Sequence, residues 1–251
     1  MTTLLVGASG ATGRLLVQQL LERSEHVRAI VRSPEHFLAT QPDTRELTVI
    51  PASVLELTDA ELAEHVAGCS AVASCLGHTL SFKGIFGPPR RLVTDAVRRL
   101  CEAVETHHHE GPTKFVLMNT TGNRNRDLDE RISFSERCVI GLIRALVPPH
   151  ADNEQAADFL RTRIGQTHPS LEWAAVRPDS LIDSPSVTAY DVHESPIRSA
   201  IFDAGKTSRI HVAHFMAQLI TDDDTWQQWK GRMPVLYNST PDTSSAISST
   251  A

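Results

Sequence analysis

The chain has 251 residues, of which 41% are hydrophobic and 22% charged, with a formal net charge of -6 at pH 7. This balance is typical of a globular chain that buries a sizeable core. The acidic net charge argues against nucleic acid or an anionic membrane as a partner. No uncharged apolar run is long enough to span a bilayer, and the first residues enter a strand without a basic leader. The four cysteines, Cys69, Cys75, Cys101 and Cys138, form no C-x-x-C pair, so we expect a reducing, cytoplasmic location.

The first predicted elements are a strand, a turn, a helix and a second strand. Thr3–Val6 is a short apolar run, Gly7–Gly13 reads GASGATG, Arg14–Arg23 has leucines at helical spacing, and His26–Val31 is again apolar. A glycine-rich turn between a strand and a helix is the setting in which backbone N–H groups bind phosphates. We therefore interpret the turn as a dinucleotide cradle, against the alternative of a glycine-rich turn without a ligand.

Each glycine of this turn has a predicted purpose. Gly7 can adopt the backbone angles of a sharp strand exit, and Gly10 carries no side chain that would hold a pyrophosphate away from the backbone. Gly13 lets the helix pack close to the strand. The predicted cofactor-binding residues of the turn are Gly7, Ser9, Gly10, Ala11, Thr12 and Gly13.

Arg32 closes the second predicted strand, where a carboxylate would hold the ribose hydroxyls of NAD. A carboxylate would repel a 2′-phosphate, whereas a guanidinium pairs with it through two hydrogen bonds. The residue type therefore favours NADP over NAD as the cofactor. The alternative interpretation is a solvated arginine at a strand end.

Strand and helix signals continue to alternate along the chain. The further predicted elements are strands at 46–50, 71–76, 114–118, 171–176 and 233–237, and helices at 59–66 (capped by Thr58 or Asp59), 90–105, 152–165 and 210–219. This order predicts an α/β fold with a Rossmann-type, doubly wound parallel sheet and a small C-terminal cap. We expect one NAD(P)-binding domain over residues 1–238, with the substrate cap mainly at 179–238. Residues 239–251 are small and polar, which predicts a flexible tail.

Ligands of such sheets bind outside the carboxyl ends of the strands. Ser53 and Val54 follow the third predicted strand, and Leu76, Gly77 and His78 follow the fourth. We predict that these residues contact the cofactor, with a plain loop histidine as the alternative for His78. The segment Thr79–Pro89 leaves the same edge and is expected either to cover the substrate or to pack over a helix. The Trp226 and Trp229 side chains, by contrast, are expected in the core or at a subunit contact.

Four segments together resemble the NAD(P)H-binding, NmrA-like group of atypical short-chain dehydrogenase/reductases. They are GASGATG, VRAIVRSPE, FVLMNTTG and LEWAAVRPDSLID. The resemblance implies a Rossmann fold, a nicotinamide cofactor and a catalytic role for Thr120, which stands where related reductases place a serine or threonine. Ser53 departs from the family pattern, which has an aspartate near the adenine there.

The resemblance breaks at the Tyr-x-x-x-Lys pair with which many of these enzymes protonate their substrate. The corresponding positions hold His150 and Glu154, and Tyr190 and Tyr237 are elsewhere in the chain. An imidazolium can act as an acid, so His150 is a candidate catalytic residue. The alternative is a loop histidine beside a helix start, and for Glu154 the alternative to a substrate contact is a solvated helix face.

Three functions remain open on the sequence. The first is an NADPH-dependent reductase of a small conjugated acceptor, such as a flavin, quinone or enone. The Leu76-Gly77 pair and the missing tyrosine resemble biliverdin-IXβ/flavin reductases in this respect. The second is a non-catalytic NADP(H) sensor that reports to a protein partner, and the third is an epimerase-like enzyme. The short C-terminal part argues against the third, and a homodimer remains open.

No metal site is predicted. His107, His108 and His109 follow a helix and precede a Gly-Pro pair. Three consecutive side chains cannot converge on one ion, so a loop run of histidines is the better interpretation.

Overall fold

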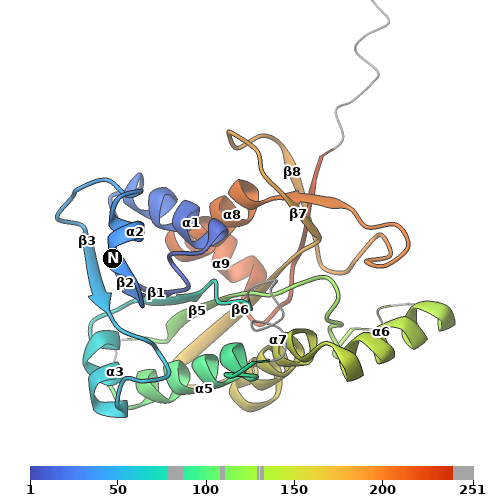
Figure 1. Cartoon of the computed structure of the whole chain (residues 1–251), viewed down its shortest axis with the longest axis horizontal. Coiled ribbons are helices and arrows are strands. Elements are labelled where there is room, and N and C mark those ends of the chain that lie inside the picture. The colour runs from blue at the N-terminus through green and yellow to red at the C-terminus, as the bar shows by residue number, and fades with distance from the viewer. Residues whose placement is uncertain (79–86, 108–110, 129, 131–132, 240–251) are drawn as a thin grey trace, which may run out of the picture.

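The computed structural model describes residues 1–78, 87–107, 111–128, 130 and 133–239, and its centre is a twisted sheet (Figure 1). In spatial order the described strands are β3 (Leu47–Pro51), β2 (His26–Val31), β1 (Thr2–Val6), β4 (Ala71–Ser74), β5 (Thr113–Met118), β6 (Leu171–Pro178), β10 (Val235–Asn238) and β8 (Tyr190–His193). All neighbours are parallel except β8, which runs antiparallel to β10. A smaller sheet pairs β7 (Ser180–Ile182) with β9 (Lys206–Ser208). The predicted Rossmann-type α/β fold is confirmed.

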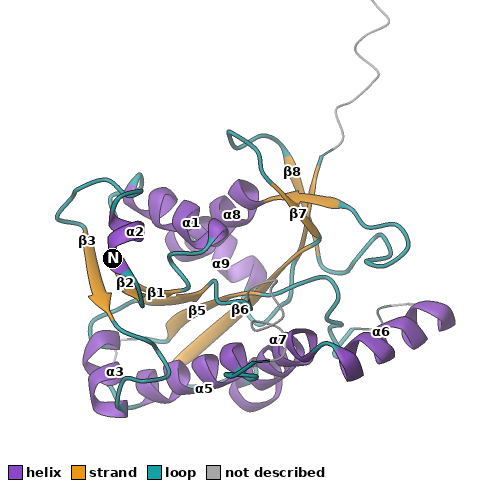
Figure 2. Ribbon diagram, in the orientation of Figure 1, coloured by secondary structure: helices purple, strands orange, loops and turns teal. Residues whose placement is uncertain are grey.

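Helices cover both faces of the sheet (Figure 2). One face carries α3 (Asp59–Val66), α5 (Leu92–Glu105) and α7 (Pro148–Phe159), and the other carries α1 (Ala11–Leu21), α8 (Arg209–Thr221) and α9 (Asp223–Trp229). The short α2 (Pro34–Leu38) follows β2, and α6 (Phe134–Leu146) extends outward beyond α7 (Figure 1). This double layering follows from strands that are apolar on both sides.

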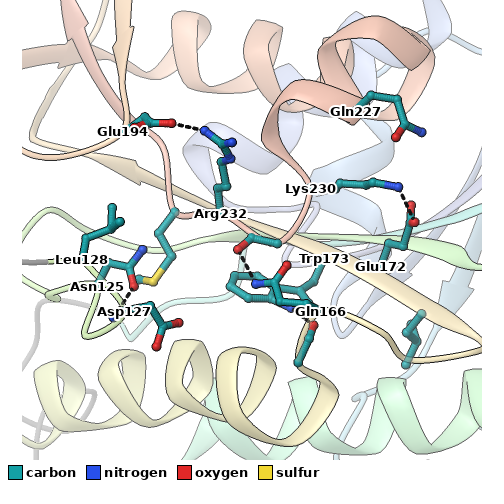
Figure 3. A pocket seen from close by; sticks show the side chains of 14 residues that line it. Asn125, Asp127, Leu128, Gln166, Glu172, Trp173, Glu194, Gln227, Lys230 and Arg232 are labelled. Atoms are coloured by element: carbon teal, nitrogen blue, oxygen red, sulfur yellow. Dashed lines mark hydrogen bonds and ion pairs between the residues drawn. The ribbon is translucent and has the colours of Figure 1, made fainter.

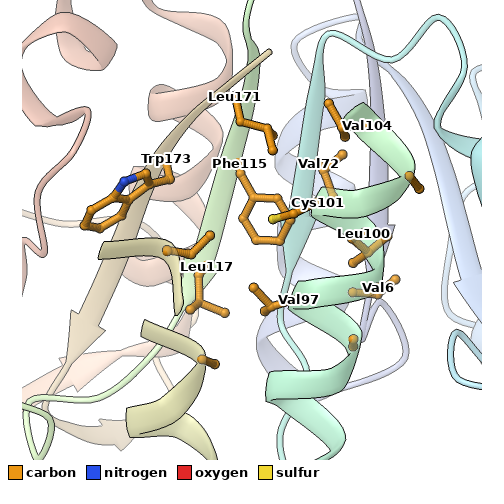
Figure 4. Close-up of a cluster of buried hydrophobic side chains, with 14 of the residues drawn as sticks. Val6, Val72, Val97, Leu100, Cys101, Val104, Phe115, Leu117, Leu171 and Trp173 are labelled. Carbon is orange, nitrogen blue, oxygen red and sulfur yellow. The ribbon is translucent and has the colours of Figure 1, made fainter. Parts of the chain in front are cut away.

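The two cores follow the strand period of two. On β1, Leu4 and Val6 belong to the core under α3, α5 and α7, whereas Leu5 belongs to the core under α1 and α8. Figure 4 shows part of the first core, to which Phe115 of β5 and Leu100 of α5 both belong. Each face of the sheet is thus covered by the apolar stripes of its helices.

Several boundaries differ from the sequence predictions. β4 ends at Ser74 rather than at residue 76, and α7 begins at Pro148 rather than at 152. Proline suits the first helical position because it needs no N–H partner there, so the Pro148-Pro149 pair opens the helix. The last predicted turn of this helix is a π-helical turn, η1 (Leu160–Ile164). His150 is consequently a helical residue.

Elements that the sequence pattern missed are short or outward-facing. They are α2, α6, α9, β7, β8 and β9. On α6 the side chains of Leu142 and Leu146 are exposed, so its apolar residues do not follow a buried stripe. By contrast, the predicted terminal helix is α8, and it is buried nearly all round. Trp226 and Trp229 lie in the same core, which was one of the two interpretations of these residues.

The N-terminus of α3 resolves the choice between two predicted caps. The Oγ1 atom of Thr58 accepts a hydrogen bond from the backbone N–H of Glu61 at 3.3 Å, and the Glu61 carboxylate accepts one from the Thr58 N–H at 2.7 Å. This reciprocal pair is a capping box. Among the described residues no helix has the length and apolar character needed to cross a membrane. The predicted tail lies, from residue 240 onward, outside the described residues.

Candidate functional site

A cavity of about 560 Å³ opens at the carboxyl ends of β1, β2, β3 and β4. Since the strand order reverses between β1 and β4, this is the topological switch point at which open α/β sheets bind ligands. The cavity lining includes the following predicted cofactor residues: Gly7, Ser9, Gly10, Arg32, Ser53, Val54, Leu76 and Gly77. Pro88 and Pro89 of the predicted covering segment also line it, while residues 79–86 lie outside the described residues.

Backbone contacts explain why two of the three positions in the glycine turn, Gly7 and Gly13, require glycine. Gly7 has a φ of 77°, and a Cβ atom there would lie 2.5 Å from the carbonyl carbon of Cys75. A Cβ atom on Gly13 would overlap the carbonyl oxygen of Gly7. Both positions therefore require glycine because backbone occupies the space of a side chain. This close approach joins the ends of β1 and β4 to the start of α1.

Gly10 is different, because the fold alone does not require it. Its φ of -71° and ψ of 164° suit any residue, and an added Cβ atom would lie 3.2 Å from the Gly7 carbonyl oxygen. Gly10 is the N-cap of α1, and no side chain of the described residues caps this helix. Ser9 and Ala11 are exposed beside it, whereas Thr12 is buried. Uncapped N–H groups at a bare helix N-terminus fit a phosphate, so the cradle fits the predicted pyrophosphate.

Arg32 lies at the end of β2 on the rim of the same cavity. Its side chain is exposed, and within the described part of the chain it makes no hydrogen bond or ion pair. A guanidinium without a protein partner at this position suits a 2′-phosphate.

The loop that carries Ser53 and Val54 is held from behind by Arg99 of α5. Arg99 donates a hydrogen bond to the Val54 carbonyl at 2.8 Å and another to the Leu57 carbonyl, and it pairs with Asp59. The carbonyl of Val54 is thereby occupied, which leaves the Ser53 hydroxyl and apolar contacts for a ligand. Sequence reasoning missed Arg99, since nothing local links α5 to this loop.

His78 has a structural partner that the sequence did not indicate. Its Nε2 lies 2.8 Å from the carboxylate of Asp152 on α7, and the imidazole is largely buried. The same carboxylate accepts hydrogen bonds from the N–H groups of Val93 and Thr94 at the start of α5. The described lining of the cavity ends at Gly77 on this segment, so a cofactor contact of His78 stays a prediction.

The two predicted catalytic residues lie together. A Cβ atom on Gly122 would lie 3.3 Å from Cε1 of His150 and 3.8 Å from the Thr120 hydroxyl, so both side chains approach the same point. Asn119 positions them, because it accepts from the Thr120 N–H at 2.8 Å and donates to the Asn153 carbonyl of α7 at 3.0 Å. The strand exit and the helix are thereby tied at the site.

His150 occupies the position of the missing tyrosine in a buried setting. Its Nε2 is buried and has no hydrogen-bond partner within the described residues. Burial lowers the pKa of His150 below its ordinary value, Glu154 opposes this, and the Arg144 charge adds to it. A lowered pKa favours the neutral imidazole near pH 7, and its unpartnered nitrogen keeps an unused hydrogen-bonding capacity.

Glu154 stands where the lysine of the pair would be, and it is not solvated. Its Oε1 accepts hydrogen bonds from Arg126 at 2.9 Å and from Arg144. Two guanidiniums on one carboxylate cannot replace a lysine on a ribose hydroxyl. The two tyrosines do not replace the missing one either, since Tyr190 bonds to α8 and the ring of Tyr237 packs on Gly205.

Arg177, at the end of β6, is a further residue that sequence reasoning missed. It is completely buried and pairs with Glu130 at 2.7 Å, and it donates to the carbonyls of Met233, Asn123 and Glu194. One guanidinium thus holds the segment after β5, the approach to β10 and the end of β8. Its signal in the sequence is the Arg-Pro pair that closes an otherwise apolar strand.

Asp179 connects this region to the Thr120 segment. Burial raises its pKa, although the carboxylate accepts hydrogen bonds from the N–H groups of Gly205 and Ser180 and from the Thr121 side chain, which oppose the shift. The end of β6 is therefore closely coupled to the segment that follows β5.

A second cavity of about 560 Å³ lies at the other end of the sheet, between β6, the approach to β10 and the segment after β5 (Figure 3). Its basic side chains are already paired, Lys230 with Glu172 at 2.7 Å and Arg232 with Glu194. Of the adjacent histidines, the His107 ring lies 2.7 Å from the Ala63 carbonyl, and 108–109 lie outside the described residues. Within the described residues no three metal-ligating side chains converge.

Comparison with known proteins agrees with this geometry. A model of the NAD(P)H-binding family matches residues 7–223, and the chain belongs to that family. The match confirms the NAD(P)H-binding resemblance that the sequence motifs indicated. No curated protein sequence matches the chain.

Solved structures share the fold at low identity. An oxidoreductase from Lactococcus lactis is 16% identical with a TM-score of 0.66, over 99% of this chain and 96% of that one. An anaerobillin reductase from Escherichia coli O157:H7 is 17% identical with a TM-score of 0.65, over 96% and 100%. A wide-type short-chain dehydrogenase/reductase from Veillonella parvula, solved in complex with NADP, is 16% identical with a TM-score of 0.63, over 94% of each chain.

Proposed function

We propose that this protein is an NADPH-dependent oxidoreductase that reduces a small conjugated acceptor, such as a flavin, a quinone or an enone. The observation that carries the proposal is the buried Nε2 of His150, which has no hydrogen-bond partner within the described residues and lies in the side chain beside Thr120, at the sheet edge that also carries the dinucleotide cradle. An unpartnered polar atom in a buried position calls for a ligand partner. The reductase named among the similar folds supports the same class of reaction.

The residues present fit NADP. The uncapped N-terminus of α1 at Gly10 would hold the pyrophosphate, and Arg32 would hold the 2′-phosphate. Ser53 and the backbone of Leu76 and Gly77 would line the adenosine and ribose. When bound, the reduced cofactor supplies a hydride at its nicotinamide ring.

The protein residues orient the acceptor and donate hydrogen bonds to it. The Thr120 hydroxyl and the His150 imidazole, which approach each other beside Gly122, would bond polar atoms of the acceptor. A neutral imidazole is a weak acid, so the site lacks the strong proton donor that an aliphatic ketone needs. A conjugated acceptor spreads the incoming charge over its ring system and can take its proton from water, which is why we favour that class.

A second function, a non-catalytic NADP(H) sensor, is favoured by one specific observation. Glu154 replaces the lysine and is held by Arg126 and Arg144. A protein that only reports cofactor binding has no need of that lysine. For this second function, the dinucleotide cradle and Arg32 would bind NADP(H) in the same way. A protein partner would then recognise the cofactor-bound form.

An acceptor panel at saturating NADPH tests the choice. We expect NADPH oxidation with flavins or quinones to exceed that with aliphatic ketones. Thr120→Val and His150→Ala should each lower kcat by about tenfold or less, since neither carries a full proton transfer. Tight NADPH binding without reduction of any acceptor would establish the sensor instead. Fast ketone turnover that His150→Ala abolishes would show that the histidine has replaced the tyrosine as the acid.

We further propose that residues 179–238 cover the acceptor, and that the protein acts in the cytoplasm on a small-molecule substrate. The support for a reducing compartment is that Cys69, Cys75 and Cys101 are free, buried thiols.

A further inference from the structure

A guanidinium with unused hydrogen-bond donors lies beside the candidate site. Arg144, on α6, contacts the protein through a single hydrogen bond from Nη2 to Oε1 of Glu154 among the described residues. The same Oε1 also accepts from Arg126, so two cations share one oxygen. Arginine has five N–H donors in a planar fork, and most of those on Arg144 have no partner within the described residues.

Arg126 and Arg144 differ in how far their charges are neutralised. Arg126 uses one nitrogen on Glu154 and another on Asp158, at 3.1 Å. Arg144 has only the shared carboxylate within the described part of the chain, and about half of its side chain, 49%, is exposed. A half-exposed guanidinium with a free fork is able to bind a carboxylate or phosphate with two parallel hydrogen bonds.

The position of Arg144 relates it to the acceptor and not to the dinucleotide cradle. Glu154 lies one helical turn after His150 on α7, and the charge of Arg144 acts on the His150 ring. The described lining of the dinucleotide cavity does not include Arg144. Through Glu154, Arg144 is thus tied to the helical turn that carries His150, and it lies outside the described lining of the dinucleotide cavity.

We infer that the acceptor carries an anionic group, a phosphate or a carboxylate, and that Arg144 binds it. This inference rests on the proposed function and specifies the substrate class of that site. Arg144 is then a specificity-determining residue. The shared carboxylate of Glu154 holds the guanidinium in place, and the acceptor's anion takes the open fork while the ring system lies at Thr120 and His150.

Two pairs of acceptors test the inference, because each pair differs mainly in one charged group. FMN is compared with riboflavin for the phosphate, and anthraquinone-2-carboxylate with anthraquinone-2-carboxamide for the carboxylate. The measured quantity is the ratio of kcat/KM values, anionic over neutral, at saturating NADPH. We expect the ratio to be well above one in at least one pair, and Arg144→Gln to lower it about tenfold.

The control substitution removes one positive charge from a different arginine. Arg163 is exposed, lies in η1 after α7, and is unpaired within the described residues. Arg163→Gln should leave the ratio unchanged, and Arg144→Lys should give an intermediate value because it keeps the charge but loses the fork. Circular dichroism and thermal melting of each variant show that it is folded.

Binding measurements separate this inference from the proposed function. FMN and riboflavin are titrated against the NADP⁺-saturated protein by fluorescence quenching. If no acceptor is reduced but FMN still binds more tightly than riboflavin through Arg144, the reductase proposal fails and the anion site stands. If both flavins and both quinones react or bind equally, and Arg144→Gln changes neither ratio, the anion site is wrong whatever the activity.

Discussion

The dinucleotide cradle at β1 and α1 is built differently from the end of the site at β5 and α7. This second region carries the predicted catalytic residues Thr120 and His150 and is the candidate catalytic end. The cradle consists of consecutive residues, and its shape comes from backbone contacts among Gly7, Gly13 and Cys75. The catalytic end consists of residues distant in the sequence, held by side chains such as Asn119, Asp152 and Arg177. A site formed by backbone atoms depends on few particular side chains, and a side chain placed inside it would overlap the backbone. A site made of side chains depends on each partner being present.

The largest expected effect concerns the Arg177 clamp of the catalytic end. Arg177→Met leaves the carboxylate of Glu130 buried without its cation, so the free energy of unfolding should fall by about 3–5 kcal/mol. Urea unfolding measures this value. Replacing both residues, as Arg177→Met with Glu130→Leu, should recover part of the loss. A single variant within about 0.5 kcal/mol of the native protein would show that the pair does not organise this end.

Substitution of Gly10 should weaken dinucleotide binding without unfolding the protein. Gly10→Val has an allowed backbone conformation but fills the approach to the helix N-terminus. We expect the Kd for NADPH to rise at least about a hundredfold, measured by fluorescence titration. Gly13→Ala is the matched contrast, since its Cβ overlaps the Gly7 carbonyl and should destabilise the fold itself. Native affinity in folded Gly10→Val would place the cofactor elsewhere.

The next largest expected effect concerns the preference for NADPH over NADH. Arg32→Asp should lower the NADPH over NADH affinity ratio by about ten- to a hundredfold, because a charge-assisted hydrogen bond is replaced by repulsion. Parallel titrations with the two nucleotides measure the ratio. Arg45→Asp changes the charge equally at another exposed arginine and should leave the ratio alone. An unchanged ratio in Arg32→Asp would remove Arg32 as the phosphate ligand.

The smallest expected effect is the contribution of His150 to the pH dependence of stability. Burial lowers its pKa from the ordinary 6.5, so the unfolded chain binds the proton more readily. Stability from this residue is complete above the unfolded pKa and declines as the pH falls through 6.5 toward the lowered folded value. His150→Gln should therefore lose less stability than the native protein between about pH 7.5 and 5.5 in urea unfolding.

The control for this measurement is the exposed His36. His36→Gln removes an imidazole from an exposed position by the same substitution, and its unfolding is measured over the same pH range. Equal losses in the native protein and both variants would contradict a buried, neutral His150.

The sequence by itself determined the order of strands and helices, the doubly wound sheet and the location of the cradle. These features depend on period-two and helical apolar patterns and on glycines at consecutive positions, which are local properties. The resemblance to related reductases also indicated Thr120, and the missing Tyr-x-x-x-Lys pair indicated His150; the structure places both beside Gly122. Their catalytic role remains a prediction.

Only the tertiary structure decided which side chains hold the two sites. Arg99 and Arg177 look like ordinary surface or strand-end arginines in the sequence, yet the carbonyl groups that they bond lie far along the chain. Likewise, the pairing of His78 with Asp152 had no signal in the sequence. Hydrogen bonds between distant residues depend on how the elements pack, and no local pattern encodes them. The cradle could be predicted because a backbone turn is encoded where it occurs. The catalytic end could not, because its geometry arises from contacts between segments that meet only in the folded chain.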